Sequence, residues 1–254
     1  MLTAQSIAAM IDHAVLAPAS TLAEVEAACR LCVDYQTASI CVRPSDVALA
    51  ARLLYGSPVK VGTVLGFPHG STSTEGKSAE AEQAWLDGCQ EVDMVLNIGR
   101  LLSGDTDFVE RDIAAVTTIA RRTGLLIKVI FETFYLDRAQ IETACGICAR
   151  AGVDFVKTST GFAGGGATVD NIRLMRTICP ERIAVKASGG IRDLDSVLAV
   201  VACGASRIGT SSTRQIVQEA RQRELAGLLQ PMPLAEALDR SQQEIGRASC
   251  GGRV

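Results

Sequence analysis

Strand-like and helix-like segments alternate along almost the whole chain, and this alternation constrains the fold more than any other feature of the sequence. Runs of five to eight mostly apolar residues are followed by amphipathic stretches, several of which begin at capping sequences such as Thr21-Leu-Ala-Glu24. The expected strands lie within residues 10–16, 38–42, 60–67, 91–98, 125–132, 154–162, 183–189 and 206–211.

Strict alternation of strands and helices with right-handed crossovers implies a parallel sheet, and eight such units close into a (β/α)8 barrel. The length of 254 residues matches this α/β fold, which takes about 250 residues. An open, doubly wound sheet is the alternative, and it is disfavoured because no GxGxxG turn follows an early strand. We therefore expect one barrel domain over residues 1–230. A tail over residues 231–254 follows, helical or disordered, and its last residues, 247–254, lack periodicity.

Charge and composition exclude several classes of partner. The net charge of -3 gives no basic field for nucleic acid, and an aromatic content of 4% leaves few platforms for stacking bases. No segment approaches the roughly 20 apolar residues of a membrane span, and the first residues lack the features of a signal peptide. We expect a cytoplasmic enzyme that binds neither nucleic acid nor membranes.

The nine cysteines do not predict disulfide bonds or a metal site. An odd count without a signal peptide argues against a disulfide framework. Two CxxC pairs, Cys29/Cys32 and Cys145/Cys148, lie inside strongly helical patterns, whereas zinc sites normally place at least one such pair in a turn. We expect both pairs to be small buried helix residues.

Lys157 stands in the middle of a segment, Asp154–Phe162, that otherwise has the composition of a short buried strand leading into a turn. An isolated lysine in such a strand usually extends its ammonium group to water. A lysine kept neutral by burial or by a neighbouring cation is instead a nucleophile toward carbonyl groups. The second interpretation is favoured because charged residues recur on three other expected strands.

Asp93, Lys128 and Lys186 take the inward position that corresponds to Lys157 on those strands, because side chains alternate between the two faces of a strand. Barrel interiors normally hold branched aliphatic residues, so these charges need an explanation. One explanation is a structural cluster of ion pairs. The other is a Schiff-base enzyme, since one carboxylate cannot neutralise three ammonium groups and one lysine is expected to lose its proton. The alternation does not identify that lysine.

Two glycine-containing turns predict a phosphate site. Gly189-Gly190 ends the seventh expected strand and Gly209-Thr-Ser-Ser212 ends the eighth, and each precedes a helix. Backbone N–H groups at two helix N-termini can converge on a dianion, and barrels commonly bind phosphate after strands seven and eight. Gly164-Gly-Gly166 is expected to be a flexible turn beside the mouth of the site.

Several of these segments resemble the deoxyribose-phosphate aldolase family. The segments are EVDMVLNIG (91–99), DFVKTSTGF (154–162), KASGGIR (186–192) and SRIGTSS (206–212), with weaker matches between residues 10 and 133. The resemblance covers residues 10–215 in the same order and spacing. It implies reversible cleavage of 2-deoxy-D-ribose 5-phosphate to acetaldehyde and D-glyceraldehyde 3-phosphate, with no metal and no cofactor.

The resemblance also implies roles for individual residues. Lys157 resembles the Schiff-base lysine, Lys186 and Asp93 the proton-handling pair, Asp12 an acidic residue near a sugar hydroxyl, and Cys41 a pocket cysteine. The remaining expected substrate- or phosphate-binding residues are Lys128, Thr160, Gly161, Gly189, Gly190, Gly209, Ser211 and Ser212.

Two positions depart from the family pattern. Ala14 stands where many members have threonine, so one polar contact to substrate is expected to be missing. The last tyrosine is Tyr135, whereas some members end in a tyrosine that assists proton transfer, so the proton step that forms the enamine is expected to be slower. His13 and His69 are further acid–base candidates, although the lysine–aspartate set is sufficient.

The sequence leaves other functions open. Another Schiff-base barrel, such as a transaldolase or a keto-acid aldolase, would use the same lysine with a different aldehyde. A sugar-phosphate-binding barrel without catalysis would use the charges structurally. A homodimer is compatible with the sequence.

Overall fold

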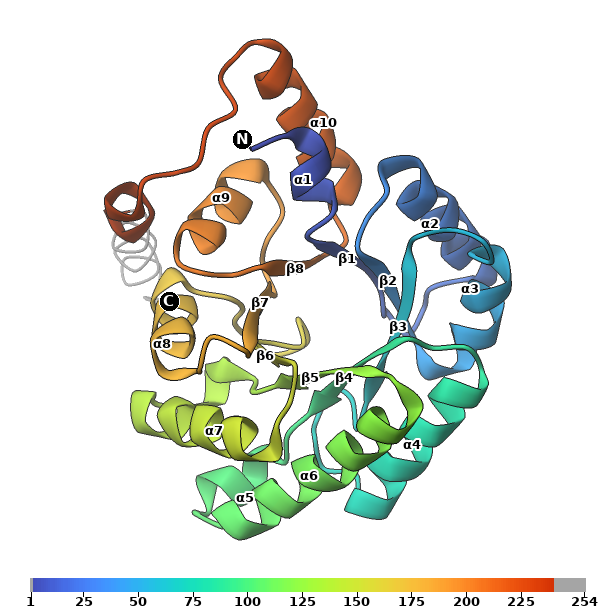
Figure 1. Ribbon diagram of the computed structural model, residues 1–254, viewed down its shortest axis with the longest axis vertical. Coiled ribbons are helices and arrows are strands. Elements are labelled where there is room, and N and C mark those ends of the chain that lie inside the picture. Colours follow the sequence, from blue (N-terminus) through green and yellow to red (C-terminus); the bar gives the residue numbers. More distant parts are fainter. Residues whose placement is uncertain (1, 240–254) are drawn as a thin grey trace, which may run out of the picture.

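Eight parallel strands form a closed barrel in the computed structural model, which describes residues 2–239 (Figure 1). Neighbours in the sequence are neighbours in the sheet, and β8 pairs with β1 to close it. The predicted (β/α)8 barrel is confirmed, and the open sheet is excluded. The strands are β1 (Ile11–Val15), β2 (Ser39–Val42), β3 (Lys60–Leu65), β4 (Glu91–Val95), β5 (Leu126–Ile130), β6 (Phe155–Lys157), β7 (Ala184–Ser188) and β8 (Arg207–Thr210).

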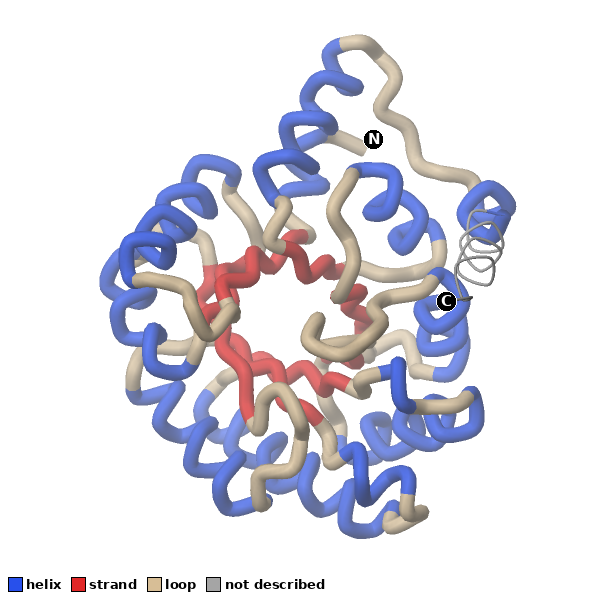
Figure 2. The backbone as a smooth tube through the Cα atoms, turned by 180° about the vertical axis from the view of Figure 1, so that it is seen from behind, coloured by secondary structure: helices blue, strands red, loops and turns tan. Residues whose placement is uncertain are grey.

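Helices form a ring outside the barrel, so their apolar faces and the outer faces of the strands make one core (Figure 2). The predicted capping box at Thr21 is present, and Asp137 forms a second one at the start of α7; in both, the capping side chain is bonded to the backbone of the first helical turn. The helices are α1 (Ala4–Ala8), α2 (Leu22–Tyr35), α3 (Val47–Leu53), α4 (Thr74–Leu86), α5 (Ile98–Leu102), α6 (Thr106–Thr123), α7 (Arg138–Ala151), α8 (Val169–Ile178), α9 (Leu194–Ala202) and α10 (Thr213–Leu225), with short 3-10 turns η1 (Pro44–Asp46) and η2 (Thr133–Tyr135).

Several strands are shorter than their apolar runs predict, because a turn or a cap intervenes. The strand expected over 91–98 ends at Val95, where Asn97 caps α5 by accepting a hydrogen bond from the N–H of Arg100. The strand expected over 60–67 ends at Leu65, since Gly66 adopts a φ of 59° and turns the chain. These early ends place the following residues in loops at the carboxyl-terminal mouth of the barrel.

The four cysteines of the two CxxC pairs are buried on α2 and α7, which confirms the prediction that they are helix residues. All eight cysteines between residues 2 and 239 are free. Within that range no helix is both long and apolar enough to span a membrane.

The separation of the chain into a barrel and a tail stays a prediction. The chain leaves α10 at Leu225, and residues 234–239 are helical, with Ala237 buried. The segment predicted to be a frayed or disordered end, 247–254, lies outside the described residues.

Candidate active site

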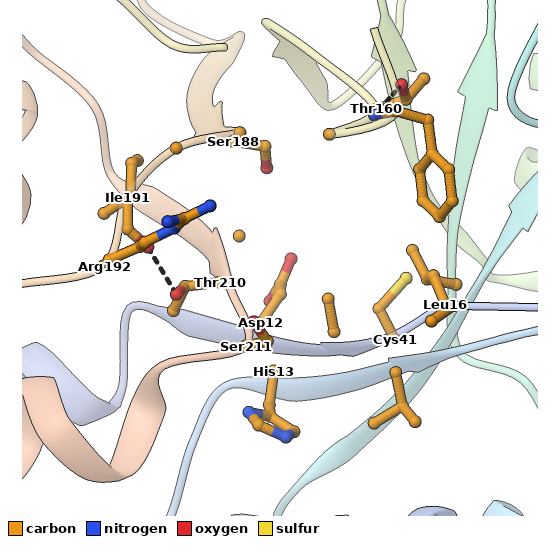
Figure 3. A pocket seen from close by; sticks show the side chains of 18 of the residues that line it. Asp12, His13, Leu16, Cys41, Thr160, Ser188, Ile191, Arg192, Thr210 and Ser211 are labelled. Carbon is orange, nitrogen blue, oxygen red and sulfur yellow. Dashed lines mark hydrogen bonds between the residues drawn. The ribbon is translucent and has the colours of Figure 1, made fainter. Parts of the chain in front are cut away.

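A cavity of about 460 Å³ opens at the carboxyl-terminal ends of the strands (Figure 3). Asp12, Cys41, Lys157 and Lys186 line it from strands β1, β2, β6 and β7. Loops that follow β1, β6, β7 and β8, together with Glu24 and Ala28 of α2, complete its wall. This is the end of a (β/α)8 barrel at which active sites are found.

The four charged residues predicted to face inward do meet inside the barrel. Asp93 accepts hydrogen bonds from all three lysines: its Oδ2 atom lies 2.7 Å from the Nζ atoms of Lys157 and Lys186, and its Oδ1 atom lies 2.7 Å from that of Lys128. All four side chains are at most 4% exposed. The strand alternation therefore placed these residues correctly.

Two further carboxylates and one further cation belong to this cluster, so the expectation of one carboxylate against three lysines is wrong. Asp12 accepts from Lys186, and its Oδ1 atom lies 2.6 Å from Nη1 of Arg207. Glu91 lies 2.8 Å from Lys128 and 3.1 Å from Arg207. Three carboxylates thus face four basic side chains, so one of the four has no carboxylate left to balance its charge.

Glu91 and Arg207 were missed although the sequence carried a signal for both. Glu91 precedes Asp93 by two residues and therefore shares its inward face. Arg207 is the register partner of Lys186 on the neighbouring strand. Its guanidinium carbon lies 5.4 Å from the ring centre of Phe155, one layer below Lys157.

The pKa values of the three lysines are shifted in different directions. Burial lowers the pKa of Lys157, the charge of Lys186 lowers it further, and Asp93 only partly opposes them. Burial acts on Lys186 and Lys128 too, but Asp12 and Asp93 outweigh it and raise the pKa of both. The lysines in turn hold the pKa values of Asp12 and Asp93 below their usual range despite burial. Lys157 is therefore the lysine of this cluster best suited to be a nucleophile.

Cys41 and His13 also line the cavity, but neither is charged near neutral pH. Burial raises the pKa of the Cys41 thiol to about 11 and lowers the pKa of His13 to about 4. Nδ1 of His13 lies 2.9 Å from Oγ1 of Thr213, the first residue of α10. His13 therefore joins β1 to α10, and His69 is exposed outside the cavity wall.

The loops after β7 and β8 form one rim of the cavity. Oγ1 of Thr210 donates to the carbonyl oxygen of Ile191 at 2.7 Å and so ties the two loops together (Figure 3). Gly189 and Gly190 have φ values of 87° and 79°, which a side chain would disfavour. Ser211 lies on the same rim. Arg192, which was not predicted, adds a cation to this rim. Its position two residues after Gly190 in the sequence could have indicated that it lies there.

Gly166 packs directly on this rim, which is a more specific role than the flexible turn expected for residues 164–166. A Cβ atom at Gly166 would lie 2.3 Å from the carbonyl oxygen of Gly189. The N–H of Ala167 donates to that oxygen at 3.0 Å. The loop after β6 is thereby held against the loop after β7.

Thr160 and Gly161 follow the Lys157 strand and line the cavity. Glu132, buried after β5, accepts hydrogen bonds from the backbone N–H and the hydroxyl of Thr160. The Thr160 side chain is thus already bonded within the protein.

The predicted site residues divide into three groups by position. The first group, Lys128 and Asp93, lies beneath the cavity within the charge cluster. The second is Ser212 alone, which is not on the cavity wall and whose backbone N–H donates to Oγ1 of Thr210 at 2.9 Å. The predicted residues that the fold brings together on the wall are Asp12, Cys41, Lys157, Thr160, Gly161, Lys186, Gly189, Gly190, Gly209 and Ser211. No group of three or more His, Cys, Asp or Glu side chains within residues 2–239 is arranged as a metal site.

Comparisons with known proteins agree with this geometry. A family model described as DeoC/LacD family aldolase matches residues 6–219. The chain is 51% identical to deoxyribose-phosphate aldolase 1 of Bacillus licheniformis, covering 84% of this chain and 96% of the relative. It is 49% identical to the deoxyribose-phosphate aldolase of Exiguobacterium sibiricum, with the same coverage of 84% and 96%. The tetrameric deoxyribose phosphate aldolase of Aeropyrum pernix superimposes with a TM-score of 0.80 at 30% identity, covering 85% of this chain and 92% of that one.

Proposed function

Because the chain belongs to the DeoC/LacD family of aldolases, we propose that it is a deoxyribose-phosphate aldolase. This lyase would reversibly cleave 2-deoxy-D-ribose 5-phosphate to acetaldehyde and D-glyceraldehyde 3-phosphate, as a step in the breakdown of deoxyribose phosphate. The observation that carries the proposal is the contrast among the buried lysines. Lys157 alone of the three has a lowered pKa, and it lines the cavity together with Lys186.

Lys157 supplies the nucleophile in this proposal. Its neutral amine attacks the C1 aldehyde of the open-chain sugar, and loss of water gives an iminium ion. Removal of the proton from the C3 hydroxyl then breaks the C2–C3 bond, and its electron pair flows into the iminium. Glyceraldehyde 3-phosphate leaves, an enamine remains, and protonation of C2 followed by hydrolysis releases acetaldehyde and the free lysine.

Asp93 and Lys186 move the protons, through a bridging water. Asp93 is deprotonated and within hydrogen-bond distance of both lysines, and the pKa of Lys186 is raised, so this lysine carries a proton. A carboxylate and an ammonium group beside one iminium can remove a proton from the C3 hydroxyl and return one to the enamine carbon. No cofactor is needed for these steps.

The phosphate binds at the rim formed after β7 and β8. Gly189, Gly190 and Ser211 provide backbone and hydroxyl donors there, and Arg192 provides a cation. Binding energy from the phosphate, remote from the C2–C3 bond, orients the sugar over Lys157.

The expected departures from the family bear on the rate. Ala14 lines the cavity without a polar side chain, and Tyr135 lies outside the cavity wall, with its ring centre 5.1 Å from that of Phe134. Proton transfer to the enamine therefore depends on the Asp93–Lys186 pair in this proposal.

A cytoplasmic setting suits the eight free cysteines of residues 2–239, since a reducing compartment keeps thiols unpaired. A homodimer stays a prediction from the sequence, and size-exclusion chromatography with light scattering tests it.

The proposal is tested by trapping. The enzyme is incubated with acetaldehyde and sodium borohydride, and the peptides are then examined by mass spectrometry. We expect one ethyl-sized adduct on the peptide that contains Lys157, together with cleavage of deoxyribose 5-phosphate. Labelling of Lys128 or Lys186 would identify another nucleophile, and absence of any label would favour a binding protein without catalysis. A label without cleavage of deoxyribose 5-phosphate would indicate another Schiff-base aldolase, which a panel of aldehydes would then identify.

A further inference from the structure

Ser188, the last residue of β7, has a hydroxyl group that the fold does not use. The residue is 4% exposed and lines the cavity, yet its Oγ atom has no hydrogen-bond partner among the residues that the structure describes. Its backbone N–H and carbonyl both bond to Oγ1 of Thr158, so the main chain is held without the side chain. A buried hydroxyl left unpaired is unfavourable, and such groups in native proteins call for an explanation.

Gly209 on the neighbouring strand makes room for this hydroxyl and packs directly against it. A Cβ atom on Gly209 of β8 would lie 2.0 Å from Oγ of Ser188 and 3.2 Å from Cε of Lys186. Any side chain at Gly209 would therefore displace both groups. Figure 3 shows the oxygen of Ser188 directed toward the inside of the barrel, but the atom itself is covered beside Gly209, so a rotation about χ1 has to bring it onto a ligand in the cavity.

The position of Ser188 along β7 places it between the two ends of the substrate. Lys186 precedes it by two residues on the same face, a rise of roughly 6.6 Å, and Lys186 is the register partner of Lys157. Gly189 and Gly190 of the phosphate rim follow directly. Ala14, which also lines the cavity, offers no polar side chain.

Building on the proposed function, we propose that the hydroxyl of Ser188 binds the C4 hydroxyl of 2-deoxyribose 5-phosphate. C1 is bonded to Lys157, and the C3 oxygen must reach the pair formed by Asp93 and Lys186. The phosphate lies on the rim formed after β7 and β8. C4 is then the remaining hydroxyl-bearing carbon, and it falls at the level of Ser188. In the synthetic direction this contact selects acceptor aldehydes that carry a hydroxyl at C2, as D-glyceraldehyde 3-phosphate does.

The test compares two acceptors in the synthetic direction, with acetaldehyde as the donor. One is D-glyceraldehyde 3-phosphate, and the other is 3-phosphooxypropanal, which has the same phosphate and aldehyde but no hydroxyl at C2. For Ser188→Ala we expect kcat/KM to fall about tenfold with glyceraldehyde 3-phosphate, as expected for loss of a buried hydrogen bond. With 3-phosphooxypropanal we expect a change of less than about twofold, because the lost hydroxyl has nothing to bind.

Ser159→Ala is the matched control. Ser159 is also fully buried and its Oγ atom also lacks a partner within the described chain, but it is not on the cavity wall. We expect Ser159→Ala to leave the ratio of kcat/KM for the two acceptors unchanged. Thermal unfolding of both variants checks that each is folded before the kinetics are compared.

Equal losses with both acceptors would overturn the assignment of Ser188, because a structural or phosphate-binding role would not discriminate between them. Unchanged kinetics with both would overturn it as well. Borohydride trapping with acetaldehyde separates this failure from that of the proposed function. Ser188→Ala should still label Lys157, whereas an unlabelled wild-type enzyme would refute the Schiff-base reaction itself.

Discussion

Lys157 and Lys186 donate hydrogen bonds to the same atom, Oδ2 of Asp93, at 2.7 Å each, but their pKa values move in opposite directions. The difference comes from Asp12, which bonds to Lys186 and raises its pKa, whereas the ion pair of Lys157 is with Asp93. One shared carboxylate thus lies beside one lysine with a lowered pKa and one with a raised pKa, which the proposed function uses as nucleophile and proton carrier. Asp12 is the carboxylate that distinguishes the two.

Replacing Lys186 by leucine should move the pH dependence of imine formation upward. Burial and the charge of Lys186 both lower the pKa of Lys157, and the substitution removes the charge but keeps the burial. A lysine with a higher pKa is neutral only at higher pH, so the trapping rate at Lys157 should begin to rise at a higher pH than in the wild type. We also expect a loss of about a hundredfold or more in turnover at pH 7.

The measurement is the rate of borohydride trapping with acetaldehyde as a function of pH, with Lys186→Arg as a control that keeps a cation. Because Lys186 also transfers protons in the proposed reaction, turnover alone is ambiguous. An unchanged pH profile in Lys186→Leu would show that burial alone sets the basicity of Lys157.

A carboxylate added to the rim should weaken phosphorylated substrates selectively. Ser211→Glu places a negative charge on the exposed rim beside Gly190. We expect kcat/KM for deoxyribose 5-phosphate to fall at least about tenfold, because like charges oppose binding of the dianion. The value for 2-deoxyribose should change little.

Gly190→Glu should have the same preference, but the φ of 79° at this residue adds backbone strain. Gly190→Ala measures that strain without the charge and is therefore its control. Equal losses for phosphorylated and unphosphorylated sugar in Ser211→Glu would remove the phosphate assignment.

Cys41→Ala should protect the enzyme from α,β-unsaturated aldehydes such as crotonaldehyde. The thiol lines the cavity beside Lys157, and its pKa of about 11 means that the reactive thiolate is scarce at neutral pH. We expect inactivation of the wild type to accelerate as the pH rises toward this value. Cys148→Ala, which removes a buried thiol outside the cavity wall, is the control. Inactivation of Cys41→Ala at the wild-type rate would show that this thiol is not the target.

Asp112→Asn should destabilise the fold by about 3–5 kcal/mol, because it leaves the fully buried ammonium group of Lys77 without its partner. This pair joins α4 to α6 at 2.6 Å, outside the cavity wall. The double variant Lys77→Met/Asp112→Asn should recover part of the loss. Urea unfolding measures both, and kcat/KM of the folded variants should stay near the wild-type value. A loss of under 1 kcal/mol in Asp112→Asn would contradict the account of this pair.

The barrel and the main charges of its site follow from simple periodicities in the sequence. A period of two placed Asp93, Lys128, Lys157 and Lys186 on one inner surface, since strand side chains alternate strictly. The same rule also places Glu91, two residues before Asp93, and Arg207, the register partner of Lys186, on the inner surface.

Other features depend on contacts between segments that are distant in the sequence. The carboxylate of Asp12 reaches Lys186 over 174 residues, and this contact determines which lysine keeps its proton. The packing of Gly166 on Gly189 depends on how two loops meet, and a single sequence carries no periodic signal for such an approach. Lys77 looks like a surface lysine of a polar helix, and its burial becomes clear only when α6 is in place.

The reactive cluster is attached to strands throughout, whereas the phosphate rim consists of loops. Substitution of a rim residue can therefore alter which aldehyde is accepted without changing the protonation states of the charged residues around Lys157. In the proposed reaction the strands thus fix the chemistry at Lys157, whereas the loops, together with Ser188 at the very end of β7, determine which acceptor is bound.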